Sequence, residues 1–599
     1  MGTESHKWVI QTVGCMVIQN IVDMRMYYTH FLREKKIFTE KFNIRRLLIT
    51  FWDKLSYCNH LILRGLKTGI LRPMNNSEFT AVLDQIETLI RKSCAFLQGD
   101  LDQEQIELYN LSFAQADLLA ARTVLSSAET NPNLAKIANY FIADVVTSIT
   151  QKFAVRPKTY GLEGNELPDL TSLQDYLAPE YVTSLGQEFL DKGLPESDVD
   201  EDKRIIRDTF RSFAEDVVMP LAEDIHRKDL LVPDEILEPL KQMGVFGLSI
   251  PERFGGLKPD TQEDSMGMVL VTEELSRGSL GAAGSLITRP EIMARALMEG
   301  GTEEQQAKWL PAIASGDTLC AVSVTEPNTG SDVASVALSA SQTEGGWLLN
   351  GGKTWCTYAG AAGALLVLAR TDKDIKPAHK GLSLFIVEKP AYTGHDFEYE
   401  QDSGGRMTGR SIPTLGYRGM HSYEMFYDNF FVPDDCLIGC EAGLGKGFYF
   451  TMRGFMGGRL QTAARACGLM RAAFEESKTY TQDRKVFGRS VSSYPLSLAK
   501  LAKMGALISV SREFTAHVAG LMDKGLGQME ASLVKLFSCR AAEWVTREGV
   551  QLHGGMGYAE EVAVSRYFAD ARVLSIFEGA EETLAIRVVG KSLIDQARN

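Results

Sequence analysis

Cysteine is scarce in this sequence and shows no pairing pattern. Nine cysteines are scattered over 599 residues, and no two of them form a Cys-x-x-Cys pair. This argues against a disulfide framework and a structural zinc site, and no metal ligands are predicted. Long hydrophobic runs are missing too, since no apolar stretch approaches the roughly 18 residues of a membrane-spanning helix. The sequence thus predicts a soluble protein of a reducing compartment, which we expect to be the cytoplasm.

Excess positive charge is also absent. The chain carries 63 Lys and Arg against 77 Asp and Glu, for a formal net charge of −14. This balance argues against nucleic-acid binding through bulk charge. No P-loop, HExxH or GxSxG motif occurs, and the glycine-rich segment 554–557 follows an expected helix rather than a strand, so a Rossmann interpretation fails. With 45% apolar residues, a large core is possible and global disorder is ruled out.

Residues 1–70 differ in charge from the rest. They carry 11 Lys and Arg against 5 Asp and Glu, whereas the chain as a whole is acidic. A basic targeting segment is one interpretation, although Glu34, Glu40 and Asp53 make it more acidic than such segments usually are. An upstream start that adds non-native sequence is the other. We attach no function to this segment.

Two helical blocks are expected before any strand. Apolar residues recur at intervals of three and four in residues 75–155, which predicts a small N-terminal helical extension. The polar stretch 156–196 contains Pro and Gly and is predicted to be a linker. Helical periodicity returns in residues 197–316, which we expect to form a helical domain.

The hydrophobic period changes after Gly316. Short β-type runs fill residues 317–437, with Asn350–Gly351 as an expected hairpin turn. Helical periodicity then returns over residues 438–599, which predicts a C-terminal helical bundle. The fold class is therefore mainly α with a central β-domain, and that domain is expected to be an antiparallel barrel or sandwich.

Four motifs carry the functional signal. They are TEPNTGSD at 325–332, RKVFG at 484–488, QLHGGMGY at 551–558 and FEG at 577–579. In this order they resemble the TEP-x-x-GSD, R-x-x-FG, Q-x-x-GG-x-G and (Y/F)-E-G signatures of the acyl-CoA dehydrogenases, over residues 197–599. The resemblance implies the fold of that family, FAD as cofactor, an acyl-CoA substrate and an electron-transferring flavoprotein as electron acceptor.

Glu578 is the candidate catalytic base. Removing the α-proton of a thioester needs a general base within hydrogen-bond reach and donors on the developing enolate oxygen. Phe577 before it and Gly579 after it favour a tight apolar turn over a solvated helix end. By resemblance, the donors are the backbone N–H of Glu578 and a flavin ribityl hydroxyl, and the β-hydrogen leaves as hydride to flavin N5. Gly579 is expected to contact the substrate.

The resemblance also implies which residues bind FAD. Val324 and Thr325 would bond the edge of the flavin ring, and Trp355 would cover it near N5 together with Thr357. A glycine at 330 lets the backbone approach a ligand closely, and the hydroxyl of Ser331 can donate to a pyrophosphate oxygen or to the substrate. The full predicted set is Val324, Thr325, Gly330, Ser331, Trp355, Thr357, Arg484, Phe487, Gln551, Gly554, Gly555 and Glu582.

Arg484 implies a homo-oligomer. In the family this arginine reaches the FAD pyrophosphate of a neighbouring subunit, where a guanidinium can bind phosphate through two hydrogen bonds. A dimer or a tetramer is therefore expected. The sequence departs from the family at Ala580 and Glu582, where Thr and Gln are usual, and at Tyr494–Pro495. Glu582 can still accept a hydrogen bond from a ribose hydroxyl.

Further segments resemble one branch of the family, the methylsuccinyl-CoA dehydrogenases of the ethylmalonyl-CoA pathway. They are the helical extension, GSLITR at 284–289, LGYRGM at 415–420 and FEGAEE at 577–582. This resemblance implies oxidation of (2S)-methylsuccinyl-CoA to mesaconyl-CoA.

Arg289 is the candidate ligand for the free carboxylate of such a substrate. It stands among apolar residues, where a lone arginine is costly unless an anion pairs with it. The alternative is that its head reaches water or an internal acid such as Glu291, and Arg418 and Arg459 are rival carboxylate ligands. Three other functions stay open: a dehydrogenase of ordinary short or branched acyl-CoA, an acyl-CoA oxidase using O₂, and a non-catalytic paralogue. The presence of Glu578 argues against the last.

Overall fold

The computed structural model describes residues 74–598. The chain divides into two compact units, Met1–Pro73 and Met74–Asn599, and only the second is described below. The expectations for residues 1–70 therefore lie outside the described residues. Within residues 74–598 no helix is both long and apolar enough to cross a membrane.

Three long helices form the N-terminal extension: α3 Asn76–Phe96, α4 Gln105–Thr130 and α5 Ala135–Val155. The first begins with a capping box, in which Asn75 Oδ1 accepts from the Glu78 N–H and the Glu78 carboxylate accepts from the Asn75 N–H. The extension shares one core with the C-terminal helices, because the ring of Phe141 meets that of Phe537 edge-on at 5.6 Å. It is therefore an integral part of the folded chain.

The predicted linker at 156–196 contains a packed helix instead. Helix α7 Pro179–Lys192 buries Leu185 and Phe189, and Phe189 contacts Phe474 of the C-terminal bundle at 6.3 Å between ring centroids. Pro and Gly residues stand before, within and after this helix, and its buried apolar face is only a few residues long. A helical hydrophobic pattern that extends over so few residues is easily obscured by turn-forming residues around it.

A helical domain precedes the sheet. Its α-helices are α8 Glu201–Phe213, α9 Met219–Arg227, α10 Asp234–Gln242, α11 Ser265–Gly278, α12 Thr288–Gly300 and α13 Glu303–Ala314. Nearly every residue of α11 is buried, because this helix packs between its own domain and the C-terminal bundle. A helix buried on all sides carries apolar side chains, or polar side chains that have partners inside the protein.

The β-domain is one sheet of eight strands: β1 Cys320–Ser323, β2 Ser339–Thr343, β3 Gly346–Thr357, β4 Ala364–Arg370, β5 Leu382–Glu388, β6 Asp396–Glu400, β7 Arg406–Ile412 and β8 Ser422–Pro433. The strand order is β1-β4-β2-β3-β8-β7-β6, with β5 also paired to β4. Most pairs are antiparallel as expected, but β1 and β4 run parallel.

The expected hairpin at Asn350–Gly351 is wrong. These residues lie inside β3, where the pairing with β8 shifts register between Leu349 and Gly351, and Gly351 has φ 137°. The β2–β3 turn lies earlier, between Thr343 and Gly346. A glycine in a strand interior often marks such a bulge, so the Asn-Gly signal was real but its structural meaning differs.

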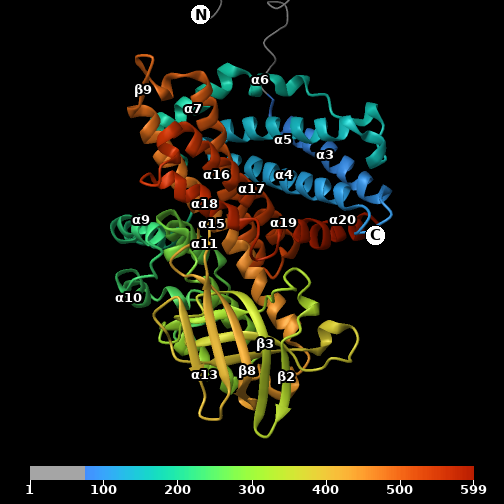
Figure 1. Ribbon diagram of the computed structural model, residues 1–599. Helices are drawn as coiled ribbons and strands as arrows, with labels where there is room; N and C mark the ends of the chain where they lie inside the picture. The colour runs from blue at the N-terminus through green and yellow to red at the C-terminus, as the bar shows by residue number, and fades with distance from the viewer. Residues whose placement is uncertain (1–73, 599) are drawn as a thin grey trace, which may run out of the picture. The chain divides into compact units, whose positions relative to one another are not determined.

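The C-terminal bundle consists chiefly of α15 Gly447–Asp483, α16 Pro495–Met522, α17 Gln528–His553 and α18 Ala563–Leu574, followed by α19 Glu581–Thr583 and α20 Lys591–Arg598. Helix α15 joins the two halves of the enzyme. It begins against β5, where Gly447 lies tightly on Ser383, and runs on through the bundle (Figure 1). Its middle turns therefore stand where helical domain, β-domain and bundle meet.

Candidate active site

Glu578 lies on a tight turn that follows α18. Its backbone is in the left-handed region with φ 54°, a strained conformation for a residue with a side chain. The next residue, Gly579, has φ 102°, so both residues of the turn need positive φ. The half-buried Glu578 carboxylate points at α15, where a Cβ placed on Gly458 would stand 2.9 Å from Glu578 Oε2. The turn thus presents the carboxylate to the helix backbone.

In the described part of the chain, the carboxylate of Glu578 has no side-chain partner, although two cations lie within electrostatic reach of it. Within residues 74–598 it forms no hydrogen bond or ion pair with another side chain, while its charge acts on Arg459 and Lys535. Burial lowers the pKa of both cations, and the negative charge of Glu578 opposes that shift. Lys535 Nζ also donates to Gly579 O at 2.6 Å. A carboxylate without a side-chain partner is free to accept a proton, and nearby positive charge can stabilise a developing enolate.

The residues predicted to bind the flavin ring lie together in the β-domain. Val324 and Thr325 follow β1, and the Thr354 N–H donates to Thr325 O at 2.9 Å, which ties this loop to β3. Trp355 on β3 has φ 58° and is 55% exposed. A large aromatic ring held out at a strained position, next to a fixed polar loop, offers a flat surface that a planar ring can cover. These residues therefore fit a flavin.

Two neighbours of this loop stabilise it and were missed by the sequence reasoning. Lys353 is 1% exposed, and its Nζ donates to Glu326 Oε1 at 2.8 Å and to Val324 O at 2.9 Å. Glu326 also accepts from two backbone N–H groups, Oε2 from Ala337 and Oε1 from Leu338. The motif TEP therefore supplies an internal ion pair as well as ligands. The sequence feature that could have revealed this ion pair is the Lys two residues before Trp355.

Thr357, Gly330 and Ser331 complete this region of the predicted site. Thr357 is buried and shares a hydrogen bond of 2.9 Å with Ser422 Oγ. Gly330 and Ser331 are exposed, and the nearest atom to a Cβ on Gly330 would be Thr325 Cγ2 at 3.9 Å. Their roles toward pyrophosphate and substrate stay predictions.

The remaining predicted FAD ligands form a second group. Arg484 ends α15 and is exposed, and the hairpin of β9 Lys485–Val486 and β10 Arg489–Ser490 follows it. Phe487 at the tip has φ 49° and is 97% exposed. Figure 1 shows this hairpin at the end of the bundle remote from the β-domain. One chain therefore does not bring Arg484 to Trp355.

The glycine-rich segment joins this second group. Gln551, Gly554 and Gly555 are exposed at the end of α17. Their neighbour His553 stacks on Tyr480 of α15 at 4.2 Å between ring centroids, which brings the QLHGGMGY and RKVFG motifs side by side. Glu582 is exposed on α19, and its expected contact with a ribose stays a prediction.

Two of the predicted carboxylate ligands, Arg418 and Arg289, differ in whether a carboxylate of the protein lies beside them. Arg418 Nη1 donates to His226 O at 2.7 Å, and its Nε lies 3.5 Å from Asp229 Oδ1, so this arginine already has partners. Arg289 is 6% exposed, and its Nη1 donates to Tyr417 Oη at 3.0 Å and to Ser285 O at 3.3 Å. Within residues 74–598 no carboxylate forms an ion pair with Arg289.

Arg465 is a buried arginine that the sequence reasoning missed. It is 0% exposed, and its guanidinium lies 4.6 Å from the centroid of the Phe577 ring. It falls outside the apolar stripe of α15, so periodicity did not mark it. An arginine within the small-residue run 463–468 was the signal that could have found it.

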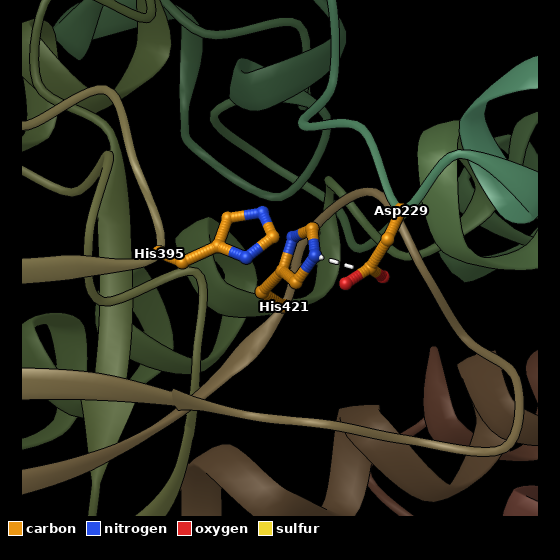
Figure 2. A group of neighbouring side chains, drawn as sticks. All are labelled: Asp229, His395 and His421. Atoms are coloured by element: carbon orange, nitrogen blue, oxygen red, sulfur yellow. Dashed lines mark hydrogen bonds and ion pairs between the residues drawn. The ribbon is translucent and has the colours of Figure 1, made fainter.

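Three possible metal ligands meet between the helical domain and the β-domain, although no metal site was predicted. Asp229, His395 and His421 have ligand atoms within 4.8 Å of one another (Figure 2). His421 Nε2 lies 3.2 Å from Asp229 Oδ1, and Nδ1 lies 3.2 Å from Gly419 O. Two imidazoles and a carboxylate suit a transition metal. However, Arg418 already stands beside Asp229, so we regard the cluster as a polar junction between the domains.

Sequence profiles of the acyl-CoA dehydrogenase N-terminal, middle and C-terminal domains match residues 200–317, 321–430 and 445–594. The chain belongs to the acyl-CoA dehydrogenase family. Enzymes of this family are FAD-dependent oxidoreductases, and the arrangement around Trp355 fits that cofactor. Residues 74–196 lie before the matched domains.

Individual relatives agree with this family. A (2S)-methylsuccinyl-CoA dehydrogenase of Cereibacter sphaeroides is 43% identical over 400 residues, which cover 67% of this chain and 71% of the relative. The butyryl-CoA dehydrogenase structure from Megasphaera elsdenii has a TM-score of 0.60 and 27% identity, and covers 67% of this chain and 100% of that one. A glutaryl-CoA dehydrogenase from Mycobacterium smegmatis in complex with FADH2 has a TM-score of 0.57 and 26% identity, and covers 66% and 95%.

Proposed function

We propose that this acyl-CoA dehydrogenase oxidises (2S)-methylsuccinyl-CoA to mesaconyl-CoA. The observation that carries the dehydrogenation is the free Glu578 carboxylate, held by a strained turn against Gly458, with Arg459 and Lys535 within electrostatic reach. The similarity to the Cereibacter sphaeroides enzyme supports this substrate. A general dehydrogenase of short or branched acyl-CoA is the alternative, since it would use the same base.

Glu578 takes the α-proton of the thioester in this mechanism. The turn fixes the direction of the carboxylate, so little reorganisation is needed when the substrate binds. Arg459 and Lys535 provide positive charge near the Glu578 carboxylate, and positive charge near the base would favour an enolate-like transition state. Bound FAD supplies the acceptor for the hydride that leaves Cβ. Val324, Thr325, Trp355 and Thr357 would hold the ring edge and cover its face.

The separation of the predicted FAD ligands supports a homo-oligomer. The group around Trp355 and the group around Arg484 lie in different parts of one chain (Figure 1), so a second copy would be needed to place both on one FAD. We propose a dimer or tetramer in which Arg484 and Phe487 of one subunit complete the site of another. An electron-transferring flavoprotein is the proposed acceptor, and the cytoplasm the proposed location.

Anaerobic bleaching of the flavin tests the proposed substrate. The purified holoenzyme is mixed with methylsuccinyl-CoA, isobutyryl-CoA or butyryl-CoA, and the loss of flavin absorbance is followed. We expect methylsuccinyl-CoA to reduce the flavin at the highest kcat/KM. Equal or faster reduction by the two uncharged esters would favour the general dehydrogenase. Peroxide formed in air without an added acceptor would indicate an oxidase, and no bleaching by any ester would indicate a non-catalytic paralogue.

A further inference from the structure

Glu578 lies in a short loop whose two ends are joined by a backbone hydrogen bond. The Glu581 N–H donates to Ser575 O at 3.0 Å, which closes the loop 575–581 around the base. Inside this loop, Glu578 and Gly579 have φ values of 54° and 102°. Strained backbone of this kind persists only where the surrounding structure holds it. The residues that hold the loop therefore decide where the Glu578 carboxylate points.

Helix α17 holds the loop at its first end and in its middle. The Ser575 hydroxyl donates to Glu543 Oε1 at 2.5 Å. Lys535 is 1% exposed, and its Nζ donates to Gly579 O at 2.6 Å. Both contacts come from one helix of the C-terminal bundle, so the bundle fixes the side of the loop that leads into the base.

The second end of the loop is held partly by the N-terminal extension. Tyr109 of α4 donates its hydroxyl to Glu581 Oε1. Arg540 Nη2 donates to the same oxygen at 3.0 Å and to Tyr109 Oη at 2.7 Å. Helix α4 lies against α17 (Figure 1), and Arg540 Cζ lies 3.3 Å from the centroid of the Phe113 ring. One carboxylate is therefore shared between the extension and the bundle.

The hydroxyl of Tyr109 is protonated at neutral pH. Burial raises the pKa of Tyr109 to about 12, and its hydrogen bond to Glu581 adds to that shift while Arg540 opposes it. Tyr109 is therefore a hydrogen-bond donor to a charged acceptor, and such bonds are shorter and stronger than bonds between neutral groups. The half-buried Glu581 side chain is thus fixed from two directions.

A second contact of α4 acts on the segment that follows the loop. Ser112 Oγ donates to Ala585 O at 2.6 Å, and both residues are buried. Ala585 belongs to the helical turns Leu584–Gly590 directly after α19. The side chain of Leu584 supports the loop, since a Cβ on Gly579 would stand 2.9 Å from Leu584 Cδ2. The extension thus contacts the chain at two successive places on the C-terminal side of the base.

We infer that Tyr109 is a positioning residue for the base, acting through Glu581 to keep the loop 575–581 in its strained conformation. The inference rests on the proposed dehydrogenation at Glu578 and gives the N-terminal extension a part in that reaction. Because Tyr109 acts on the base and not on the ester, losing its hydroxyl should slow proton removal from every ester that the enzyme oxidises by a similar factor. Binding of the ester should not change.

Tyr109→Phe tests this role, because it removes only the hydroxyl. Flavin reduction of the holoenzyme is followed by rapid mixing with methylsuccinyl-CoA and with butyryl-CoA. We expect the limiting rate to fall by about 5- to 50-fold with each ester that wild type oxidises, since a misplacement of about 1 Å can cost about 100-fold. The half-saturating ester concentration should stay within about threefold. Tyr181→Phe is the matched control and should behave as wild type, because the Tyr181 hydroxyl donates to Lys136 O within the extension.

A double-mutant cycle shows whether Tyr109 acts through Glu581. Glu581→Ala should slow flavin reduction by about 10- to 100-fold, and Glu581→Gln, which keeps an acceptor oxygen, should recover much of that loss. Adding Tyr109→Phe to Glu581→Ala should change the rate by less than about twofold, because the partner of the hydroxyl is already gone. Hydrogen exchange of the peptide 575–581 in the resting holoenzyme should rise in Tyr109→Phe and stay unchanged in Tyr181→Phe.

A limiting rate in Tyr109→Phe within about twofold of wild type would overturn the inference, and so would losses that add in the double variant. Circular dichroism and FAD content show whether each variant is folded and loaded; if Tyr109→Phe is not, the difference between Glu581→Ala and Glu581→Gln decides. Should wild type reduce its flavin with no ester while exchange still rises at 575–581, the proposed dehydrogenation fails and the anchoring of the loop stands. Normal flavin reduction by wild type with unchanged exchange in Tyr109→Phe overturns the anchoring alone.

Discussion

The carboxylate of Glu578 rests against the backbone of Gly458. A Cβ at position 458 would come within 2.9 Å of Glu578 Oε2 and 3.3 Å of its carboxyl carbon. These residues come from the terminal turn and from the middle of α15, so the position of the base depends on the packing of that turn against this helix. Glycine at 458 leaves the space that the carboxylate occupies.

Gly458→Ala should reduce turnover while leaving the fold intact. Alanine is a better helix former than glycine, so no backbone strain is introduced, but its methyl group must displace the Glu578 carboxylate. A misplacement of about 1 Å can cost around 100-fold, and we expect kcat to fall by about 10- to 100-fold. Gly520→Ala on α16 is the control, because a Cβ there meets nothing within 4 Å. Unchanged kcat in Gly458→Ala would mean that the carboxylate turns elsewhere when substrate binds.

Glu578→Gln should retain FAD and substrate binding but lose reduction of the flavin. The amide is nearly isosteric and cannot accept the α-proton at neutral pH. A positioned base contributes about 100- to 10,000-fold, and rapid-mixing measurement of flavin bleaching would detect the loss. Glu180→Gln, at an exposed position on α7, should reduce its flavin at a near wild-type rate. Bleaching of Glu578→Gln within tenfold of wild type would assign the proton to another group.

Lys353→Met should weaken FAD retention through the loop at 324–326. The substitution leaves Glu326 buried without its cation, and breaking one partner of a buried pair costs about 3–5 kcal/mol. We expect a lower FAD-to-protein ratio after gel filtration and a lower Tm. Lys308→Met removes an exposed pair with Glu388, which should cost less than about 1 kcal/mol. Equal behaviour of the two variants would show that the buried pair does not hold the flavin loop.

Much of the architecture could be predicted because it depends on local hydrophobic period. The order of helices, sheet and bundle follows from residue spacing, and Glu578 was predicted as the base because the FEG segment 577–579 resembles the family's (Y/F)-E-G signature. The packed helix α7 could not be predicted with the same ease, because the burial of its residue Phe189 depends on a distant segment, where it meets Phe474. The Asn350–Gly351 bulge could not be predicted for the same reason, because it depends on the pairing of β3 with the distant strand β8.

The charges of the candidate site were harder to predict than its motifs. Arg289 and Arg418 look alike in the sequence, but only the structure shows that Arg418 is engaged by His226 O and Asp229 whereas Arg289 has no acid. Arg465 has no sequence signal beyond its small-residue surroundings. Whether a cation is paired depends on segments that meet only in the folded chain, and periodicity carries no such information.

Asp117 on α4 should make the enzyme less stable above pH 6. Burial raises its pKa from 3.8 to about 6, while Lys152 and Arg540 partly oppose the shift. A raised folded-state pKa means that its favourable contribution is full below about pH 4 and is lost as the pH rises through about 6, because folding then buries a charged carboxylate. Asp117→Asn removes that charge at the same size, and should be more stable by about 1–3 kcal/mol at pH 7.5.

The test of Asp117 is the pH dependence of Tm for the holoenzyme and the variant between pH 4.5 and 8. The gain in Asp117→Asn should shrink toward the acidic end, where wild type is protonated as well. Asp175→Asn, on the exposed face of α6 Gln174–Leu177, should show no such pH-dependent gain. A Tm difference that stays constant across this range would place the effect in packing or hydrogen bonding. A Tm difference that grows as the pH rises toward 6 would identify the Asp117 charge as the cause. It would then show that this charge opposes the packing of the extension on the bundle.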